Sequence, residues 1–328
     1  MVLSSTFAFS SMALLVSLMG HRSIPSLQSA VARYWLSLLL SLATIAIARR
    51  GALCTASTWI GEPHHRRLLL IRGLWGAGGM SSYFWALSKL SIGDATVLMF
   101  VNVPLTALMA AVLIGEPYTL VDGITGILCM AGVVLVAQPA AIFGGEGEVP
   151  ALAVVVCLFG ALTSSLAYVT IRQLGPTADP LVITLAFSAV GSVIAPLLLL
   201  MAQVPQPLAS GEDIWQMLLV GLLGYLGQLA LNRGIQLAPA GPATVMRYTD
   251  VIFALAFSTW LFGNPPGLVK LGGVALISSS VGGVLYRQRL KTLAARAATV
   301  RAADSEAAPG AEVAGVEEGK GAGLQSTA

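Results

Sequence analysis

Residues 84–117 read FWALSKLSIGDATVLMFVNVPLTALMAAVLIGEP, and residues 232–265, which lie 148 positions later, read NRGIQLAPAGPATVMRYTDVIFALAFSTWLFGNP. Sliding the whole sequence against itself by 148 positions without a gap gives fourteen identities in the forty-nine positions 73–121. Six of the fourteen are Gly or Pro, which mark backbone geometry rather than hydropathy. The chain therefore contains an internal repeat.

The composition of the chain places it in a membrane. It has 328 residues, of which 56% are hydrophobic and 10% are charged, and its mean hydropathy is +0.83. A soluble globular protein carries about 25% charged residues, so this chain lacks the charge to cover a surface in water. Its apolar stretches are long and do not alternate with polar residues, as the strands of a transmembrane barrel do. We therefore predict an all-α integral membrane protein.

Interruptions of the apolar stretches divide the chain into ten predicted transmembrane helices. The breaks contain turn residues such as Gly175-Pro176. The predicted helices span about 4–20, 29–48, 67–88, 92–114, 118–138, 151–172, 181–202, 214–236, 242–262 and 266–286. Helices three to five match helices eight to ten at the offset of 148, so each repeat has five helices. Because five is an odd number of crossings, the second copy is expected to be inverted in the membrane.

The predicted domains are a first five-helix repeat at 1–140, a second at 141–286 and a tail at 287–328. The tail is rich in Ala, Gly, Glu and Ser, which cannot bury enough apolar area to order a chain, so we expect it to be disordered.

The positive charges predict the orientation in the membrane. If both termini face the cytosol, the cytosolic side holds Arg49, Arg50, Arg66, Arg67, Arg172, Arg287, Arg289, Lys291, Arg296 and Arg301. The opposite side then holds only Arg22, Arg33, Lys89 and Lys270. Positive charges favour the cytosolic side, so this orientation is predicted, and the sequence leaves open whether the membrane is the plasma membrane or an endomembrane.

Several classes of function are excluded by what the sequence lacks. The net charge is +3 and no run of Lys or Arg is dense enough to bind a phosphate backbone, so nucleic acid is not an expected partner. No Walker loop, nucleophile with a base, or metal-ligand spacing is present, so we expect no enzyme, cofactor, metal or ATP-driven pump. Inverted repeats allow alternating access around a midplane site. A secondary carrier is therefore the leading function, with a small-molecule substrate and the lipid bilayer as partners and a homodimer left open.

Ionisable residues inside the predicted helices are the first candidates for a site. A charge at membrane depth costs several kcal/mol unless it is paired or faces water. Arg247 lies about six residues into the ninth predicted helix, and Asp250 follows at i+3 on the same face. The two form either an anion-binding site or a permanent structural pair, and we favour the anion site. Arg233, near the end of the eighth helix, either adds positive charge to the cavity or anchors the helix at the interface.

Uncharged polar side chains supply the remaining candidates for binding a substrate. They can hydrogen-bond a polar solute while their apolar parts pack. These candidates are Tyr83, Asn102, Tyr168, Gln228, Asn232 and Tyr248. At the offset of 148, Arg247 and Asp250 correspond to Met99 and Asn102, so the second half is expected to supply most of the positive charge. Pro104 removes a backbone hydrogen bond and can permit the fourth helix to bend.

The first half of the chain resembles a known family. Residues 84–117, preceded by Arg72-Gly73, resemble the EamA repeat of the drug/metabolite transporter superfamily. The glycines that follow, Gly123, Gly126 and Gly132, extend the resemblance through the fifth predicted helix. It implies a ten-helix carrier for small metabolites with two inverted repeats, whose central cavity is lined by helices 1, 3, 4, 6, 8 and 9.

The second half resembles one branch of that superfamily. Residues 227–255, GQLALNRGIQLAPAGPATVMRYTDVIFAL, are similar to the G-type branch of solute-carrier family 35, which has basic residues at the positions of Arg233 and Arg247 and an Asp at that of Asp250. In relatives that carry phosphates or nucleotide sugars, basic residues of the ninth helix hold the anionic group. One departure is that the acid Glu116 of the first half is matched by Asn264 in the second.

Three functions are consistent with these features. The one we favour is a multi-pass secondary transporter that moves a small organic anion or metabolite by alternating access around a midplane cavity. The second is a low-selectivity exporter of neutral or amphipathic metabolites. The third is a non-transporting membrane scaffold, in which the polar residues of the spans are packed without access to water.

Overall fold

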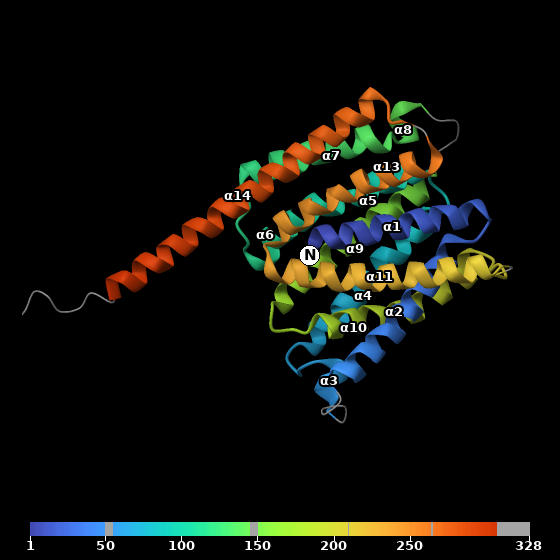
Figure 1. The fold of residues 1–328 in the computed structure, drawn as a ribbon. Helices are drawn as coiled ribbons and strands as arrows, with labels where there is room; N and C mark the ends of the chain where they lie inside the picture. The colour runs from blue at the N-terminus through green and yellow to red at the C-terminus, as the bar shows by residue number, and fades with distance from the viewer. Residues whose placement is uncertain (50–54, 145–149, 209, 264, 307–328) are drawn as a thin grey trace, which may run out of the picture. The chain divides into compact units, whose positions relative to one another are not determined.

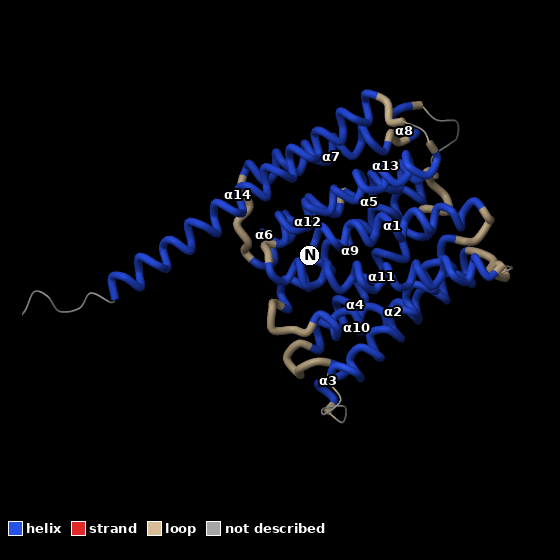
Figure 2. Tube along the Cα trace, viewed as in Figure 1, coloured by secondary structure: helices blue, strands red, loops and turns tan. Residues whose placement is uncertain are grey.

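The computed structural model describes residues 1–49, 55–144, 150–208, 210–263 and 265–306. These ranges are helical and contain no strand (Figures 1 and 2). Residues Met1–Val281 form one compact unit and Gly282–Ala328 a second. The elements are α1 (Val2–His21), α2 (Ser26–Ala48), α3 (Ala56–Ile60), α4 (Arg66–Ala86), α5 (Ile92–Phe100), α6 (Asn102–Ile114), α7 (Leu120–Ala137), α8 (Ala140–Phe143), α9 (Ala151–Leu174), α10 (Pro180–Ala202), α11 (Gly211–Leu237), α12 (Ala240–Val245), the 3₁₀ turn η2 (Met246–Tyr248), α13 (Thr249–Phe262) and α14 (Leu268–Glu306).

Eight helical segments of the described chain are long and apolar enough to cross a membrane. They are α1, α2, α5 together with α6, α7, α9, α10, α11 and α14. The predicted count of ten is therefore not confirmed, because two predicted spans are missing from this set. The span 67–88 corresponds to α4, which carries Arg66, Arg67 and Arg72. The span 242–262 is divided into α12, η2 and α13.

Two glycines end the fourth helix of each half in the same way. Gly115 follows α6 and Gly263 follows α13, and both have φ of +69°. Glycine adopts this left-handed conformation without the steric cost that other residues incur, and it closes the last helical turn. The two positions are 148 residues apart, so the sequence repeat reproduces one turn geometry at both places.

The two halves pack together in a reciprocal pattern. The first helix of each half packs against the third helix of the other, because α1 packs against α11 and α4 packs against α9. Val2 at the start of α1 lies against Gly234 near the end of α11, and Phe9 lies against Gly227, so these helices run antiparallel. Figure 1 shows the second helices, α2 and α10, side by side below them. This is the packing that an inverted repeat produces.

The crossing of α4 and α9 depends on glycine at position 79. A Cβ atom there would lie 2.3 Å from the Ser164 hydroxyl and 2.9 Å from the Gly160 carbonyl oxygen. Its neighbour Gly78 has no atom within 4 Å of the corresponding position. We predict that Gly79→Ala lowers the stability of the detergent-solubilised protein by about 1–3 kcal/mol, whereas Gly78→Ala does not lower it, because alanine favours a helix interior over glycine. Thermal unfolding checks this, and equal melting temperatures for the two variants would contradict the close crossing.

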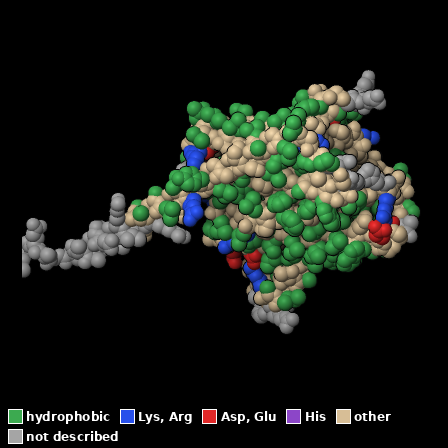
Figure 3. Space-filling view, turned by 45° about the horizontal axis from the view of Figure 1, so that its top comes forward, with side chains coloured by type: hydrophobic (Ala, Val, Ile, Leu, Met, Phe, Trp, Pro, Cys, Tyr) green, Lys and Arg blue, Asp and Glu red, His purple; other side chains and the backbone are tan. Residues whose placement is uncertain are grey.

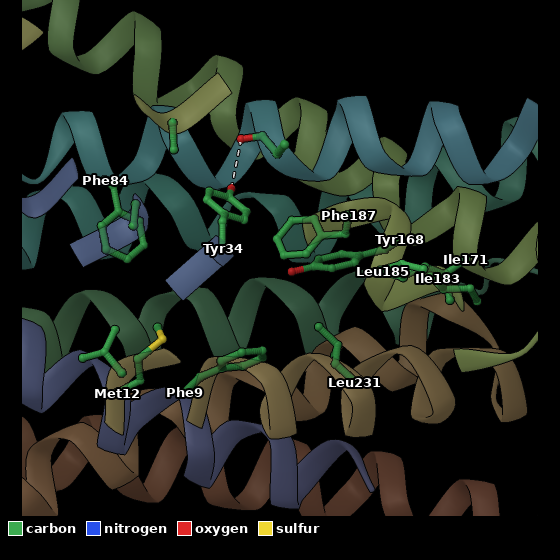
Figure 4. Close-up of a cluster of buried hydrophobic side chains, with 14 of the residues drawn as sticks. Phe9, Met12, Tyr34, Phe84, Tyr168, Ile171, Ile183, Leu185, Phe187 and Leu231 are labelled. Atoms are coloured by element: carbon green, nitrogen blue, oxygen red, sulfur yellow. Dashed lines mark hydrogen bonds between the residues drawn. The ribbon is translucent and has the colours of Figure 1, made fainter. Parts of the chain in front are cut away.

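The core of the first unit lies between these helices, and its outer face is apolar. In the core, the Tyr34 hydroxyl donates to the Ala77 carbonyl at 3.3 Å (Figure 4). Outside, Trp35 and Trp260 are 56% and 81% exposed. Figure 3 shows hydrophobic side chains over much of one face, with charged side chains in a few small groups. Lipid chains cover such a face without the free-energy cost that water would impose.

The helix α14 extends beyond the predicted end of the last span. It continues to Glu306, so residues 287–306 are helical where the composition predicts disorder. This stretch contains many Ala, Leu and Arg residues, which have high helix propensity. Residues 307–328 of the predicted tail lie outside the described residues.

Candidate functional site

The fourth helix of each half is broken at the same point. Residue Val101 separates α5 from α6, and η2 separates α12 from α13. Pro104 explains the first break, because its ring nitrogen cannot donate a hydrogen bond to the preceding turn. The second half has Ile252 at the corresponding position, and there a 3₁₀ turn interrupts the helix without proline. Such a turn inside a helix often marks a functional hinge.

The two breaks meet through a pair of rings. Phe100 and Tyr248 are 148 positions apart, and their rings stack with centroids 5.5 Å apart and planes inclined by 26°. Corresponding residues of two inverted repeats can touch only near the axis that relates the halves. Tyr248 is fully buried in this contact, and its hydroxyl has no hydrogen-bond partner within the described chain. The pair therefore places both breaks beside the interface of the two halves.

A cavity of about 140 Å³ lies beside the breaks. Its wall contains residues of both halves, and much of it is apolar, including Phe9, Met12 and Phe84. The polar residues of the wall are Ser10, Arg33, Tyr83, Thr96, Asn102, Ser164, Tyr168, Gln228, Arg247 and Asp250. Six of the nine residues proposed from the sequence are in this set, namely Arg247, Asp250, Gln228, Tyr83, Asn102 and Tyr168. The structure thus brings together residues that are up to 167 positions apart in the chain.

Arg247 has several partners on the cavity wall. It donates a hydrogen bond to the Tyr168 hydroxyl, and its guanidinium carbon lies 5.3 Å from the centroid of that ring. Its Nη2 lies 3.7 Å from Oδ2 of Asp250. This distance is too long for a hydrogen bond, so the two side chains form an ion pair without one. Its Nε is buried without a partner in the described chain. Arg247 therefore keeps a free donor, and its only acid partner among the described residues is held loosely.

Arg33 is a wall residue that the sequence prediction missed. It was counted among the charges on the side opposite the cytosol, near the start of the predicted helix 29–48, but it lies in α2 and is fully buried. Its Nη1 contacts the Met80 sulfur at 3.1 Å, and its guanidinium carbon lies 5.3 Å from the centroid of the Phe9 ring. Nε and Nη2 have no hydrogen-bond partner within the described chain. Gly224 on α11 makes room for this side chain, because a Cβ there would lie 2.8 Å from Arg33.

Phe9 brings the two wall arginines to one part of the cavity. The guanidinium carbons of Arg33 and Arg247 lie 5.3 and 5.9 Å from the centroid of its ring. A cation over an aromatic face is stabilised by the ring quadrupole, but the ring supplies no negative charge. Asp250 is the one acid on the wall among the described residues. The wall therefore carries an excess of positive charge.

Three residues predicted to contact substrate do not line this cavity. Arg233 donates instead to the Pro176 carbonyl at 3.3 Å. Asn232 is buried between helices, where it donates to the Thr184 hydroxyl at 2.9 Å and accepts from Gln228 at 3.0 Å. Tyr248 lies against Phe100, as described above. These side chains thus support the wall or lie away from it.

Arg72 is a further buried arginine, and it lies off the wall. It is 2% exposed, and its guanidinium carbon is 5.0 Å from the centroid of the Phe187 ring. Its Nε and Nη1 have no hydrogen-bond partner among the described residues. Gly76 makes room for it, because a Cβ there would overlap the Arg72 side chain.

A vestibule of about 630 Å³ joins the cavity at one end. The two spaces share Ser10, Met12, Ala13, Tyr83, Phe84 and Ala254. The other vestibule residues, such as Gly20, Leu87 and Gln203, lie at the ends of α1, α4 and α10. Just beyond α1, Arg22 contacts Glu212 at 2.6 Å, and this hydrogen bond raises the pKa of the Arg22 guanidinium. We call this side of the first unit the vestibule end.

At the opposite end, a set of polar contacts around Glu116 connects the two halves. Its carboxylate accepts from Arg172 Nε at 2.6 Å and from the Ala240 amide at 2.8 Å. Arg172 also donates to the Gln236 carbonyl at 2.9 Å. These contacts join the end of α6 to the ends of α9 and α11, so they tie the first half to the second. We call them the Glu116 latch, and neither of its charged residues was selected from the sequence.

Comparison with known proteins identifies the family. A model of the EamA-like transporter family matches residues 1–138 and 151–286. The chain is 30% identical to a probable transport protein of Saccharomyces cerevisiae, with 66% of each chain covered. It is 26% identical to solute carrier family 35 member G1 of Homo sapiens, over 70% of this chain and 65% of that one. The chain therefore spans just under two thirds of the length of these two relatives.

A bacterial relative and a solved structure extend the comparison. The pseudopaline exporter of Pseudomonas aeruginosa is 27% identical over 84% of this chain and 92% of that one. A protein crystal structure superposes with a TM-score of 0.69 at 18% identity, covering 88% of this chain and 98% of the other. At that identity the superposition supports the fold alone. The family match, the relatives and the apolar helices agree with the resemblance seen in the sequence. The chain belongs to the EamA-like transporter family, and its apolar helices are those of a multi-pass membrane protein.

Proposed function

We propose that this transporter moves a small organic anion by alternating access. The observation that carries the proposal is that Arg33 and Arg247 face one cavity in which Asp250 is the one acid among the described residues. An unpaired charge buried in a membrane protein costs several kcal/mol. An anionic group that accepts the free donors of the two guanidiniums would offset that cost. The cavity therefore favours a substrate with at least one negative charge.

The proposed mechanism uses the two ends of the first unit. In the proposal, α4 and the divided segment 240–262 also cross the bilayer, which makes ten crossings in two inverted five-helix repeats, 1–140 and 141–286. Both termini face the cytosol, so the vestibule end faces away from it and the Glu116 latch lies on the cytosolic side. The substrate enters through the vestibule, and the latch then opens while the vestibule closes. The 3₁₀ turn η2, which carries Arg247, is the hinge on the second half.

Transport of benzenesulfonate into proteoliposomes tests this function. This anion stays ionised at every working pH, and its ring suits the aromatic wall. The full chain should give saturable uptake above that of empty liposomes, and a panel of small carboxylates and organic phosphates extends the search. Failure of every anion in the panel to show saturable uptake would contradict an anion carrier.

Substitution of Arg247 provides the first prediction for this assay. Arg247→Ala should lower kcat/KM for the anion about 30-fold or more, because truncating one member of a buried charged contact costs 2–5 kcal/mol. Arg233→Ala is the matched control, because Arg233 is an arginine of the same region that does not line the cavity. It should retain uptake. An Arg247→Ala variant that transports normally would remove Arg247 from the anion site.

A second candidate function is export of neutral or amphipathic metabolites. The apolar part of the wall, which includes Met80, Met99 and Leu231, favours it. Benzenesulfonamide has the ring of benzenesulfonate without its charge, so it separates the two functions. If the amide competes with benzenesulfonate as well as unlabelled benzenesulfonate does, the cavity selects for the apolar body and not for the charge.

A further inference from the structure

Asp250 is held on the cavity wall by few partners. Its Oδ1 accepts from the Ser10 hydroxyl at 2.7 Å, and its Oδ2 lies 3.7 Å from Arg247 Nη2. Ser10 also contacts the Asp250 carbonyl oxygen at 2.9 Å, which keeps this hydroxyl on α13. Arg247 is thus the only positive charge in contact with the carboxylate among the described residues. The negative charge of Asp250 depends on this one contact.

An anion that binds Arg247 changes the balance of charge around Asp250. Arg247 has one guanidinium, and its Nη1 is already engaged by Tyr168. A bound anion would therefore take the Nη2 and Nε donors, and Nη2 is the atom that faces Asp250. The carboxylate would then be a buried charge beside a second negative charge, without its cation. Taking up a proton on Asp250 removes the repulsion between its carboxylate and the bound anion.

Among the titratable groups around Asp250, its own carboxylate is the one suited to accept a proton. The elements packed against α13 are α1, α7 and η2. From α1 the facing group is the Ser10 hydroxyl. The buried thiol Cys129 of α7 makes no hydrogen bond to Asp250 among the described residues. The 3₁₀ turn η2 contributes Arg247 and Tyr248. Across the cavity lie the cation Arg33 and the phenols Tyr83 and Tyr168. Arginine stays protonated, and phenols and thiols are neutral near pH 7, so the carboxylate is the wall group suited to gain a proton on anion binding.

We propose that Asp250 is a proton-binding site that couples transport to a proton gradient, so that one proton travels with each anion bound at Arg247. This inference rests on the proposed anion transport. The proton comes from water at the open end and binds an Oδ atom of Asp250 as the anion takes Arg247. When the anion leaves at the other end, the proton is released there and the Arg247–Asp250 contact forms again. With a monovalent anion, one proton and one negative charge cross the membrane together, so the cycle moves no net charge across it.

Two fluxes of benzenesulfonate in proteoliposomes separate this inference from the proposed function. Counterflow at equal pH needs only anion exchange, whereas uphill accumulation driven by acid outside needs proton coupling. For a gradient of two pH units, one-to-one coupling drives accumulation toward a limit of about 100-fold, because the anion ratio follows the proton ratio. A potassium diffusion potential should not change this limit. Absence of counterflow contradicts the proposed function, while counterflow without acid-driven accumulation overturns the proton coupling alone.

Neutralising Asp250 tests the assignment of the proton site. Asn resembles the protonated carboxyl, so Asp250→Asn should keep counterflow and lose at least 90% of the acid-driven accumulation. Asp250→Glu retains an ionisable carboxyl, so it should keep more of the acid-driven accumulation than Asp250→Asn does. Asp94→Asn is the matched control, because Asp94 is buried in α5 away from the cavity wall, where it accepts from Ser91, and it should keep both fluxes.

Two results with these variants would overturn the assignment. One is acid-driven accumulation by Asp250→Asn at the parent level. The other is loss of counterflow in Asp250→Asn with an unchanged melting temperature, because the inference requires the loaded state to form with a neutral side chain at this position.

Discussion

Arg33→Met is expected to raise the thermal stability of the protein and to reduce benzenesulfonate uptake to the level of empty liposomes. Arg33 is fully buried, and two of its nitrogens have no partner among the described residues. Replacing a buried ion pair by apolar side chains of similar volume often stabilises a protein by about 1–4 kcal/mol, and a buried charge without an acid partner is at least as costly. The same replacement removes a positive charge from the cavity wall. We therefore expect stability and transport to change in opposite directions.

Arg72→Met is the control for this prediction. Arg72 is also buried with unpaired nitrogens, but it contacts Phe187 off the cavity wall. It should share the gain in stability and leave the KM for the anion unchanged. Melting temperatures and uptake kinetics of the two variants check both parts. If Arg33→Met keeps the uptake of the parent, then Arg33 belongs to the packing of the protein and not to its binding site.

Glu116→Ala is expected to open the latched end of the cavity. The substitution leaves Arg172 and the Ala240 amide without the carboxylate that accepts from both. Losing a charged acceptor of this kind costs about 1–3 kcal/mol, which changes the ratio of closed to open latch by about 5- to 150-fold. Both partners belong to the second half, so these contacts exist only when the two halves are joined at this end. Their loss therefore destabilises the closed latch and not the open one. The open latch should then become a populated state.

A cysteine on the cavity wall reports this opening. Thr96 lines the cavity but not the vestibule, so Thr96→Cys is introduced after the three native cysteines are replaced. With the parent latch, a membrane-impermeant thiol reagent should label this residue mainly from the vestibule end. With Glu116→Ala it should label from both ends. Glu62→Ala, which removes an exposed acid before α4, should behave as the parent does. Labelling that does not change in Glu116→Ala would show that the latch does not hold this end closed.

Local spacing made part of the site predictable. Arg247 and Asp250 lie at i and i+3, so their proximity follows from helical geometry alone, and both line the cavity. Position along the helix left two roles open for Arg233, in the cavity or as an anchor at the helix end, and in the structure its side chain donates to the Pro176 carbonyl. Arg33 lies within the predicted helix 29–48, but it was counted with the charges on the side opposite the cytosol because it follows the predicted start of that helix by only four residues.

The sequence by itself determined the class of the protein, its internal repeat and the bend that Pro104 permits in the fourth helix of the first half. These features depend on backbone geometry and on neighbours within a turn or two, which local sequence specifies. Only the tertiary structure decided that Arg33 joins Arg247 over the Phe9 ring and that Glu116 reaches Arg172 and Ala240. These contacts join helices far apart in the chain. They depend on which face each helix turns toward its partners, and in a helix that is apolar on all sides no pattern of polar residues marks that face.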